Sequence, residues 1–319
     1  MYSLTHQMEP LRPPHSAALT ALAQRVITAD ARLSEIVRPE AKAAAAEMVL
    51  AMNCHYSNLI EGITIPPAEI ERALKNDFSS DQKQADLQHL GAAHIRTAHM
   101  MSNRVKAGQL PVDANFICEC HRVFYDGMPR SLLQVDDGTL IEPGAFRKRD
   151  VIVRQHVPPA WESIPEFMAR FGAAYASQHV PKSSRLIDIA AAHHRLVWIH
   201  PFVDGNGRVS RIVADAMLLD AGVNVDGLWS LSRGFAKGLV VEGGKSITYV
   251  SRLHNADRSR LGNYDGRGNL STKTLTEFCE YVLRTAIDQI GFMTSVFERD
   301  DISLHAGLPE SGQILDSPS

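Results

Sequence analysis

The chain has 319 residues, of which 45% are hydrophobic and 22% charged, and its formal net charge is −3. This composition is typical of a globular protein and excludes long disordered or fibrous stretches, and the near-balanced charge excludes a global basic field for non-specific nucleic-acid binding. The four cysteines form no C-x-x-C pair, no run of about 18 apolar residues occurs, and the first 14 residues lack the apolar core of a secretion signal. We therefore expect a cytoplasmic protein without structural zinc.

Apolar residues at helical spacing dominate the first 125 positions. The first segment places Leu19, Leu22, Val26 and Leu33 on one face, and the second is rich in alanine, which has the highest helix propensity. The pattern predicts helices over residues 17–36, 41–52, 68–75, 87–105 and 113–125.

Glycine and proline interrupt residues 126–159, so helix is not expected there. Within this segment the β-branched run at 150–153 predicts a short strand or hairpin. Helical spacing returns over 163–177, 186–198, 209–221 and 272–297, and a loose tail is expected after Arg299. The predicted fold class is all-α with one small β element.

Residues 200–211, with the sequence HPFVDGNGRVSR, concentrate groups suited to phosphate chemistry. Pro201 prevents a straightforward continuation of the preceding helix, and Gly205 and Gly207 permit a tight turn and a close approach of a ligand. A helix that begins near Arg208 presents free N–H groups and a dipole that favour an anion. Arg208 and Arg211 lie three residues apart and add positive charge on one face.

His200 and Asp204 add reactive groups to this turn. An imidazole can accept a proton near neutral pH, and a carboxylate can hold a divalent cation. Each residue alone is explained as part of a glycine-rich helix start, but the combination indicates phosphoryl or nucleotidyl transfer.

The run matches every fixed position of the signature of the Fic family, H-P-F-x-[DE]-G-N-G-R-x-x-R. The resemblance implies a helical bundle with a small β-hairpin flap, and transfer of AMP from ATP to a Ser, Thr or Tyr hydroxyl of a target protein with Mg²⁺ or Mn²⁺. It implies that His200 is the general base, that Asp204 binds the metal and that Phe202 is a core anchor. The implied ATP phosphate ligands are Gly205, Asn206, Gly207, Arg208 and Arg211. Doc-type kinases resemble this motif but carry Lys where this chain has Gly207, which favours AMP transfer.

Upstream, Ser57 to Gly62 reads SNLIEG and resembles the family's inhibitory motif, [ST]-x-x-x-E-[GN]. Taken alone, Glu61 is explained as a solvated carboxylate at a helix end. The resemblance implies that Glu61, with Ser57, pairs with Arg211 and removes the charge that seats the γ-phosphate, so that bound ATP is misdirected.

Residues 143–147 and 151–159 resemble the family's flap. A free strand edge there could pair with an extended segment of a target, or with a second copy during self-modification. The residues assigned to this edge are Arg149, Asp150, Val151, Ile152 and Val153. By resemblance, Tyr249, Leu253 and Asn255 form an adenine pocket. Neither DNA nor a membrane is an expected partner, whereas a homo-oligomer is compatible with the sequence.

These assignments divide the chain into four parts. An N-terminal helical region (1–110) contains the inhibitory helix (about 41–62), and the Fic core (111–225) contains the flap (about 143–157) and the signature loop (200–211). A helical extension (226–298) and a loose tail (299–319) follow.

Two other functions remain open on the sequence. Glu61 could orient water to remove AMP from a modified protein, or the chain could be a nucleotide-responsive binding module. The intact His200 and Asp204 argue against the second.

Overall fold

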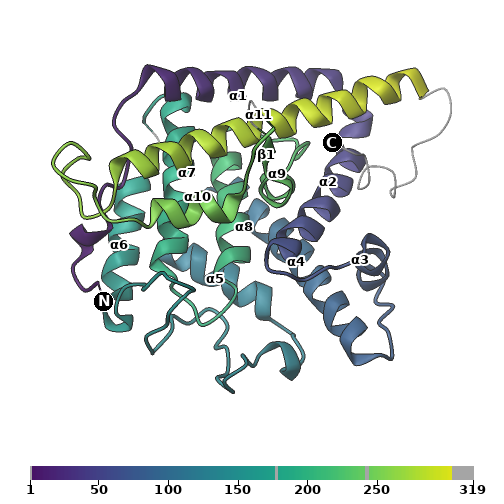
Figure 1. Ribbon diagram of the computed structural model, residues 1–319. Coiled ribbons are helices and arrows are strands. Elements are labelled where there is room, and N and C mark those ends of the chain that lie inside the picture. The colour runs from purple at the N-terminus through teal and green to yellow at the C-terminus, as the bar shows by residue number, and fades with distance from the viewer. Residues whose placement is uncertain (1, 177–178, 241–243, 304–319) are drawn as a thin grey trace.

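The computed structural model describes residues 2–176, 179–240 and 244–303. Helices make up most of this part of the chain (Figure 1). The longer helices are α1 (Ala17–Ile36), α2 (Pro39–Ile60), α4 (Gln82–Lys106), α5 (Ala114–Tyr125), α6 (Ile164–Tyr175), α7 (Lys182–Ile199), α8 (Asn206–Asp220) and α11 (Thr272–Ser303). The short ones are α3 (Pro67–Leu74), α9 (Leu231–Lys237) and α10 (Tyr249–Ala256). Two strands, β1 (Leu239–Val240) and β2 (Ser246–Ile247), pair antiparallel.

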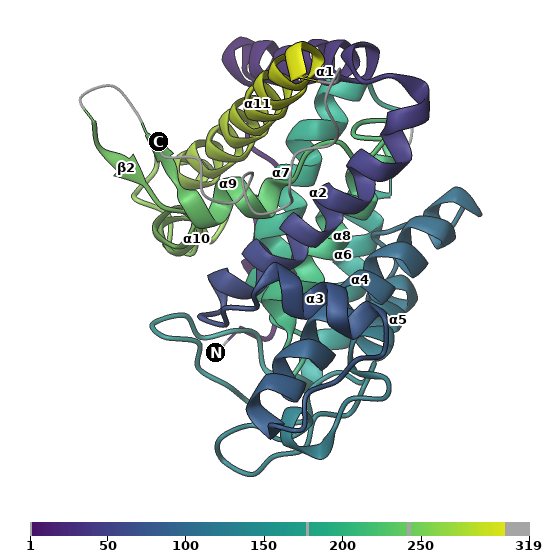
Figure 2. The same cartoon turned by 90° about the vertical axis from the view of Figure 1, so that its right-hand side faces the viewer.

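The α7–α8 pair forms the centre of the molecule. Helix α7 packs against α1, α6, α8 and α11, while α8 packs against α2, α4 and α5. Helices α1 and α11, from opposite ends of the chain, lie side by side along the top in both views (Figures 1 and 2). Nearly every residue of α7 from Ile189 to Ile199 is buried, which explains the run of alanines and large apolar residues there.

Local sequence explains where several helices begin. Ser16 accepts a hydrogen bond from the Leu19 N–H at the start of α1, and Asp113 accepts one from Asn115 at the start of α5. Pro39 occupies the first turn of α2, where its missing N–H removes no helical hydrogen bond.

A tight turn joins α7 to α8. His200 ends α7 in the left-handed conformation with φ of 50°, and Gly205 caps α8 with φ of 78°. The Asn206 side chain closes the turn, because its Oδ1 accepts from Phe202 N and its Nδ2 donates to Phe202 O, both at 2.9 Å. Helix α8 therefore begins at Asn206, two residues earlier than predicted.

The all-α fold class is confirmed, with corrections to individual elements. Of the short strand or hairpin expected at 150–153, no strand forms, and a tight turn at 153–156 is closed by one isolated antiparallel bridge between Val153 and His156. The sheet lies instead in the 239–247 region, where none was predicted. Helix α11 continues six residues beyond Phe297 into the expected loose tail, and residues 304–319 lie outside the described part of the chain. None of the described helices is long and apolar enough to cross a membrane.

Candidate active site

The first turn of α8 lies against a carboxylate supplied by the chain itself. A Cβ atom added to Gly207 would lie 2.2 Å from Glu61 Oε1, so the carboxylate is in direct contact with the backbone of this turn. A helix N-terminus attracts an anion through its free N–H groups and its dipole. Glu61 therefore occupies the position that favours an anionic ligand.

Arg211 joins α8 to the end of α2. Its guanidinium is buried, with 3% of the side chain exposed, and its Nε donates to Ser57 Oγ at 2.8 Å. Its Nη2 donates to Ser57 O at 2.8 Å and to Glu61 Oε1 at 2.7 Å. Both residues of the predicted inhibitory motif thus contact the arginine predicted from the motif.

Asp204, Arg208 and Tyr125 form a second cluster. Asp204 Oδ2 accepts from the Tyr125 hydroxyl and from Arg208 Nη2, both at 2.7 Å, and the Arg208 guanidinium lies over the Phe124 ring at 5.1 Å. Burial alone would raise the pKa of Asp204, but the charge of Arg208 and the hydrogen bonds from Tyr125 and the Gly205 backbone outweigh it and lower the pKa. Asp204 is therefore ionised at neutral pH.

The donor set fits a magnesium ion that is shared with phosphates. Among the described residues no group of three or more His, Cys, Asp or Glu side chains is arranged to hold a metal ion. Mg²⁺, however, is usually bound by one or two carboxylates together with substrate phosphates and water. The Asp204 side chain is 47% exposed, so it can contact such an ion while keeping its protein partners.

His200 is held at the end of α7 as a neutral imidazole. Its backbone carbonyl accepts from Arg147 Nε at 2.9 Å, and its Nδ1 is buried without a hydrogen-bond partner among the described residues. Burial, aided by the charges of Arg147 and His156, lowers the pKa of His200 to about 4. The imidazole is therefore uncharged at neutral pH, with one ring nitrogen unprotonated.

A cavity of about 160 Å³ lies beside these groups, between α8, α10 and the end of α2. The residues predicted from the sequence that line it are Glu61, Val153, His200, Gly207, Arg211, Tyr249 and Leu253. Those outside its lining are Ser57, Arg149, Asp150, Val151, Ile152, Asp204, Gly205, Asn206, Arg208 and Asn255. The structure thus separates the predicted site into the cavity, the Asp204 cluster and the residues that hold the turn.

The predicted adenine pocket is only partly assembled. Tyr249 and Leu253 line the cavity, whereas Asn255 does not. The Tyr249 hydroxyl is engaged by His193 Nε2 at 2.9 Å, and the His193 Nδ1–H points to Ser210 O at 3.2 Å. His193 is therefore a packing residue behind the site.

Three supporting residues were not identified from the sequence. Arg147 ties the predicted flap to the turn, since it donates to Arg149 O, Pro159 O and His200 O. Tyr125 binds Asp204, as described above. His121 accepts from Gly144 N on Nδ1 and so donates from Nε2 to Asp204 O, while its ring stacks on Phe202 at 3.9 Å.

The sequence signal for these residues was limited. Arg147 belongs to the segment that resembles the flap, but nothing in that segment states which carbonyl groups it binds. Phe202 is fully buried against His121, in agreement with its predicted role as a core anchor.

Comparison with known proteins identifies the central part of the chain. Residues 111–218, which include α5, α6, α7, the turn at 200–205 and most of α8, match the model of the Fic/DOC family. This segment is similar to Fic domains.

Relatives with curated names support this assignment. The chain is 34% identical over 168 residues to a protein adenylyltransferase Fic of Drosophila virilis, and 33% identical over the same length to one of Drosophila melanogaster. In both cases the match covers 53% of this chain and 32% of the relative. The chain thus spans about a third of the length of the curated relatives it matches.

Solved structures with a Fic domain share the fold over most of the chain. A Fic family protein from Desulfovibrio desulfuricans has a TM-score of 0.58 at 16% identity, covering 94% of this chain and 79% of that one. Fic-1 from C. elegans has a TM-score of 0.62 at 16% identity, covering 89% and 74% respectively. The helical fold predicted from the Fic signature is therefore confirmed.

Proposed function

We propose that this protein transfers AMP from ATP to the hydroxyl of a Ser, Thr or Tyr side chain in a target protein. The observation that carries the proposal is the convergence of a neutral His200, the buried Arg211 and the N-terminal turn of α8 on one cavity. The relatives named protein adenylyltransferase support the same reaction.

In this reaction the hydroxyl oxygen attacks the α-phosphorus, its proton passes to His200, and the bond to the β-phosphate oxygen breaks to release pyrophosphate. The N–H groups of the α8 turn and the guanidinium of Arg211 would hold the phosphates. Arg208, which is hydrogen-bonded to Asp204, would add positive charge near the phosphates. Mg²⁺ bound at Asp204 would neutralise phosphate charge.

The remaining assignments from the sequence belong to this proposal. Residues 111–225 would be the catalytic core, preceded by the region 1–110 with its inhibitory helix and followed by the extension 226–298. The segment 149–153 would dock the target, and a second copy could be the target in self-modification. We place the protein in a reducing compartment such as the cytoplasm, since its four cysteines are all unpaired.

We further propose that Glu61 inhibits transfer in cis. Its carboxylate lies where a terminal phosphate would meet α8 and Arg211. The cavity of about 160 Å³ is smaller than the range of about 300–1,000 Å³ that ligand sites usually occupy, as expected if a side chain fills part of the site. Bound ATP would then be displaced from in-line geometry, which lowers the rate.

The test uses purified protein, Mg²⁺ and ATP labelled on the α-phosphate. Glu61→Gly should incorporate at least about a hundredfold more label than wild type, since freeing a buried arginine changes binding by several kcal/mol. Leu59→Gly, an exposed position in the same last turn of α2, controls for fraying and should behave as wild type. Glu61→Gly combined with His200→Ala should incorporate none. Label retained without His200, or no gain in Glu61→Gly, would refute the proposal.

A second candidate reaction is removal of AMP from a modified protein. It is favoured by the position of Glu61, whose side chain is 36% exposed beside the cavity and can contact water. In this case wild type releases AMP from a target that Glu61→Gly has modified, and Glu61→Gly alone does not.

A further inference from the structure

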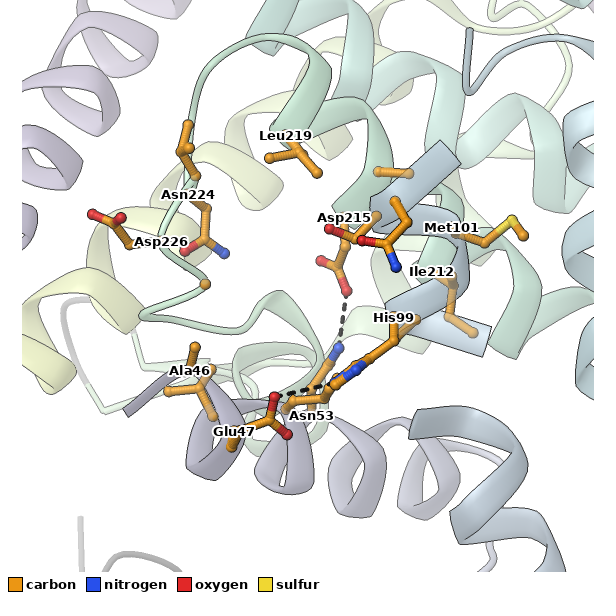
Figure 3. Close-up of a pocket in the computed structure, with 18 of the residues that line it drawn as sticks. Ala46, Glu47, Asn53, His99, Met101, Ile212, Asp215, Leu219, Asn224 and Asp226 are labelled. Atoms are coloured by element: carbon orange, nitrogen blue, oxygen red, sulfur yellow. Dashed lines mark hydrogen bonds and ion pairs between the residues drawn. The ribbon is translucent and has the colours of Figure 1, made fainter. Parts of the chain in front are cut away.

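A larger cavity lies on the other side of α2, away from the Fic turn. It has a volume of about 350 Å³ and is enclosed by α2, α4, α8 and the segment that follows α8 (Figure 3). Its apolar wall consists of Ala46, Val49, Leu50, Met101, Ile212, Ala216, Leu219 and Trp229. This volume lies in the range that small-molecule ligands occupy.

Asp215 is one of the polar residues that line this cavity. Its Oδ2 accepts from Asn53 Nδ2 at 2.9 Å (Figure 3), and the Asn53 amide is held in place by Ser230 Oγ, which donates to Asn53 Oδ1 at 2.8 Å. The hydrogen-bond partner that the structure gives the Asp215 carboxylate is therefore a neutral amide.

The other acidic groups of the cavity contact basic side chains. Glu47 pairs with His99 at 3.3 Å across the mouth (Figure 3), and Asp226 pairs with Lys42 at 2.7 Å. Lys106 also lines the mouth. Asp215 thus differs from Asp226 in having a neutral amide as its hydrogen-bond partner, and a partly buried carboxylate is stabilised by a cation that enters the cavity.

The cavity adjoins a regular series of contacts between α2 and α8, which we call the α2–α8 ladder. Its three contacts are Asn53 with Asp215, Ser57 with Arg211, and Glu61 with Arg211 at the Gly207 turn. Asn53, Ser57 and Glu61 are four residues apart along α2, and they face Asp215, Arg211 and Gly207, which are four residues apart along the antiparallel α8. A ligand on Asp215 would sit at one end of the ladder, and Glu61 lies at the other.

We propose that this cavity binds a small primary amine with an apolar body, whose ammonium group contacts Asp215 and whose occupancy holds α2 against α8. The apolar wall comes from both helices, since α2 supplies Val49 and Leu50 and α8 supplies Ile212 and Leu219. A ligand that bridges two elements binds best when they are docked and so stabilises the docked state. Stabilising the docked state also stabilises the contact of Glu61 with the first turn of α8.

The probe is hexylammonium, with hexanol and hexanoate as neutral and anionic molecules of the same chain length. Isothermal titration calorimetry should show one saturable site for hexylammonium, with at least about tenfold weaker binding of the other two, because a charge-assisted contact to Asp215 is lost. Equal binding of all three, or no binding, would overturn the proposal without any variant having to fold.

Two substitutions assign the contact. Asp215→Asn keeps the shape and an acceptor for Asn53 and should weaken hexylammonium at least about tenfold. Asp226→Asn, at the mouth, should leave its affinity within about twofold, since Asp226 is paired with Lys42. Circular dichroism verifies that both variants are folded. An equal loss of hexylammonium affinity in the two variants would mean that the negative charge of the cavity as a whole, and not Asp215, binds the ammonium group, and it would overturn the proposal.

Titration of Asp215 supplies an independent signature. Burial raises the pKa of Asp215 to about 7, against the hydrogen bond from Asn53 and the charge of Arg211. The other charged groups facing it are Glu47 on α2, His99 and Lys106 on α4, and Asp226. Because the ammonium needs the ionised carboxylate, affinity should rise about tenfold from pH 6 to pH 8. Asp215→Asn should remove most of this rise, and a persistent rise would contradict the assignment.

Hydrogen exchange tests the effect on α2. Saturating hexylammonium should slow amide exchange at residues 53–62 at least threefold in wild type and leave it unchanged in Asp215→Asn. If hexylammonium binds wild type but amide exchange in α2 is unchanged, the ligand does not hold α2 against α8, and that part of the proposal is refuted. Neither measurement depends on nucleotide transfer, so the site is tested separately from the proposed function.

Discussion

At the scale of single residues, the position of the Glu61 carboxylate depends on the absence of a side chain at Gly207. Any side chain at 207 would meet the Glu61 carboxylate, because the position of its Cβ lies 2.2 Å from Oε1. Gly207 is the second residue of α8, and glycine is less favourable than alanine in a helix by up to about 1 kcal/mol. The glycine is therefore explained by the close approach of an anion, whether that anion is Glu61 or a phosphate.

This dependence predicts opposite effects of Gly207→Ala in two backgrounds. In wild type the new methyl group should push Glu61 away from Arg211 and lower the free energy of unfolding by about 1 kcal/mol. In Glu61→Gly the remaining close neighbour is Arg211 Nη1 at 3.2 Å, the end of a flexible side chain that can shift, so the variant should gain up to about 1 kcal/mol from helix propensity. Urea denaturation of the four proteins measures both changes, and a change of the same sign in both backgrounds would disprove the coupling.

Tyr125 holds Asp204 through a hydrogen bond that Phe cannot make. Tyr125→Phe should lower the free energy of unfolding by about 1–2 kcal/mol, because a hydrogen bond to an ionised group is lost while Arg208 stays buried. The pKa of Asp204 should rise as well, since the Tyr125 hydroxyl is one of the groups that lower it. Chemical denaturation gives the stability, and carboxyl NMR titration gives the pKa. The matched control is Tyr264→Phe, which is fully exposed and should have no effect.

At the scale of elements, Arg147 organises the long segment between α5 and α6. Its backbone N–H donates to Pro201 O at 2.9 Å, and its guanidinium binds carbonyls of residues 149, 159 and 200. No ladder of paired strands holds this segment in place. The hydrogen bonds from the buried Arg147 side chain to backbone carbonyls hold it instead.

Arg147→Lys should therefore loosen both the segment and the turn. A lysine ammonium lacks the planar fork of arginine and would leave buried carbonyls unpaired, at about 2–4 kcal/mol. Hydrogen exchange of residues 148–160 should accelerate and the free energy of unfolding should fall. Arg154→Lys, exposed on the same segment, should change neither. Unaltered exchange in Arg147→Lys would show that other contacts hold the segment.

The same segment shows where prediction from the sequence stopped. The β-branched run at 151–153 favours a strand, but a strand also needs a partner, and only Val153 pairs, with His156. The turn at 200–205 was predictable because its residues are contiguous, and Glu61 was predictable through its motif.

Arg147, Tyr125 and His121 were not predictable in the same way. They meet the turn across 53 to 83 residues of chain, and only the packing of α5 against α8 brings two of them there. Helix α1 was predicted to both ends, whereas α2 continues beyond the predicted end at residue 52 to Ile60 and α4 begins at Gln82, before the predicted start at residue 87. In the stretch from 226 to 270, the bounds of the two short helices and the two-residue ladder were not assigned from the sequence.

At the scale of the whole molecule, several neutral histidines are buried around the α7–α8 pair. Burial is the main cause that lowers the pKa of His94 and His193 to about 3 and of His121 and His200 to about 4. In the unfolded chain a histidine titrates near 6.5. Between that value and about 4 the unfolded state binds these protons more readily, so the free energy of unfolding falls as the pH falls.

His94 provides the sharpest test of this dependence, since both of its ring nitrogens are buried without a partner among the described residues. Below pH 6.5 each such imidazole steepens the loss of stability by about 1.4 kcal/mol per pH unit. His94→Leu should therefore flatten the slope of unfolding free energy between pH 6 and pH 4.5 by about that amount, measured by urea denaturation. It should also raise stability at pH 7 or leave it unchanged, because an unsatisfied polar group is removed. The control is His15→Leu, at an exposed position before α1, for which the slope of unfolding free energy against pH should equal that of wild type. An unchanged slope in His94→Leu would mean that His94 is protonated in the folded protein.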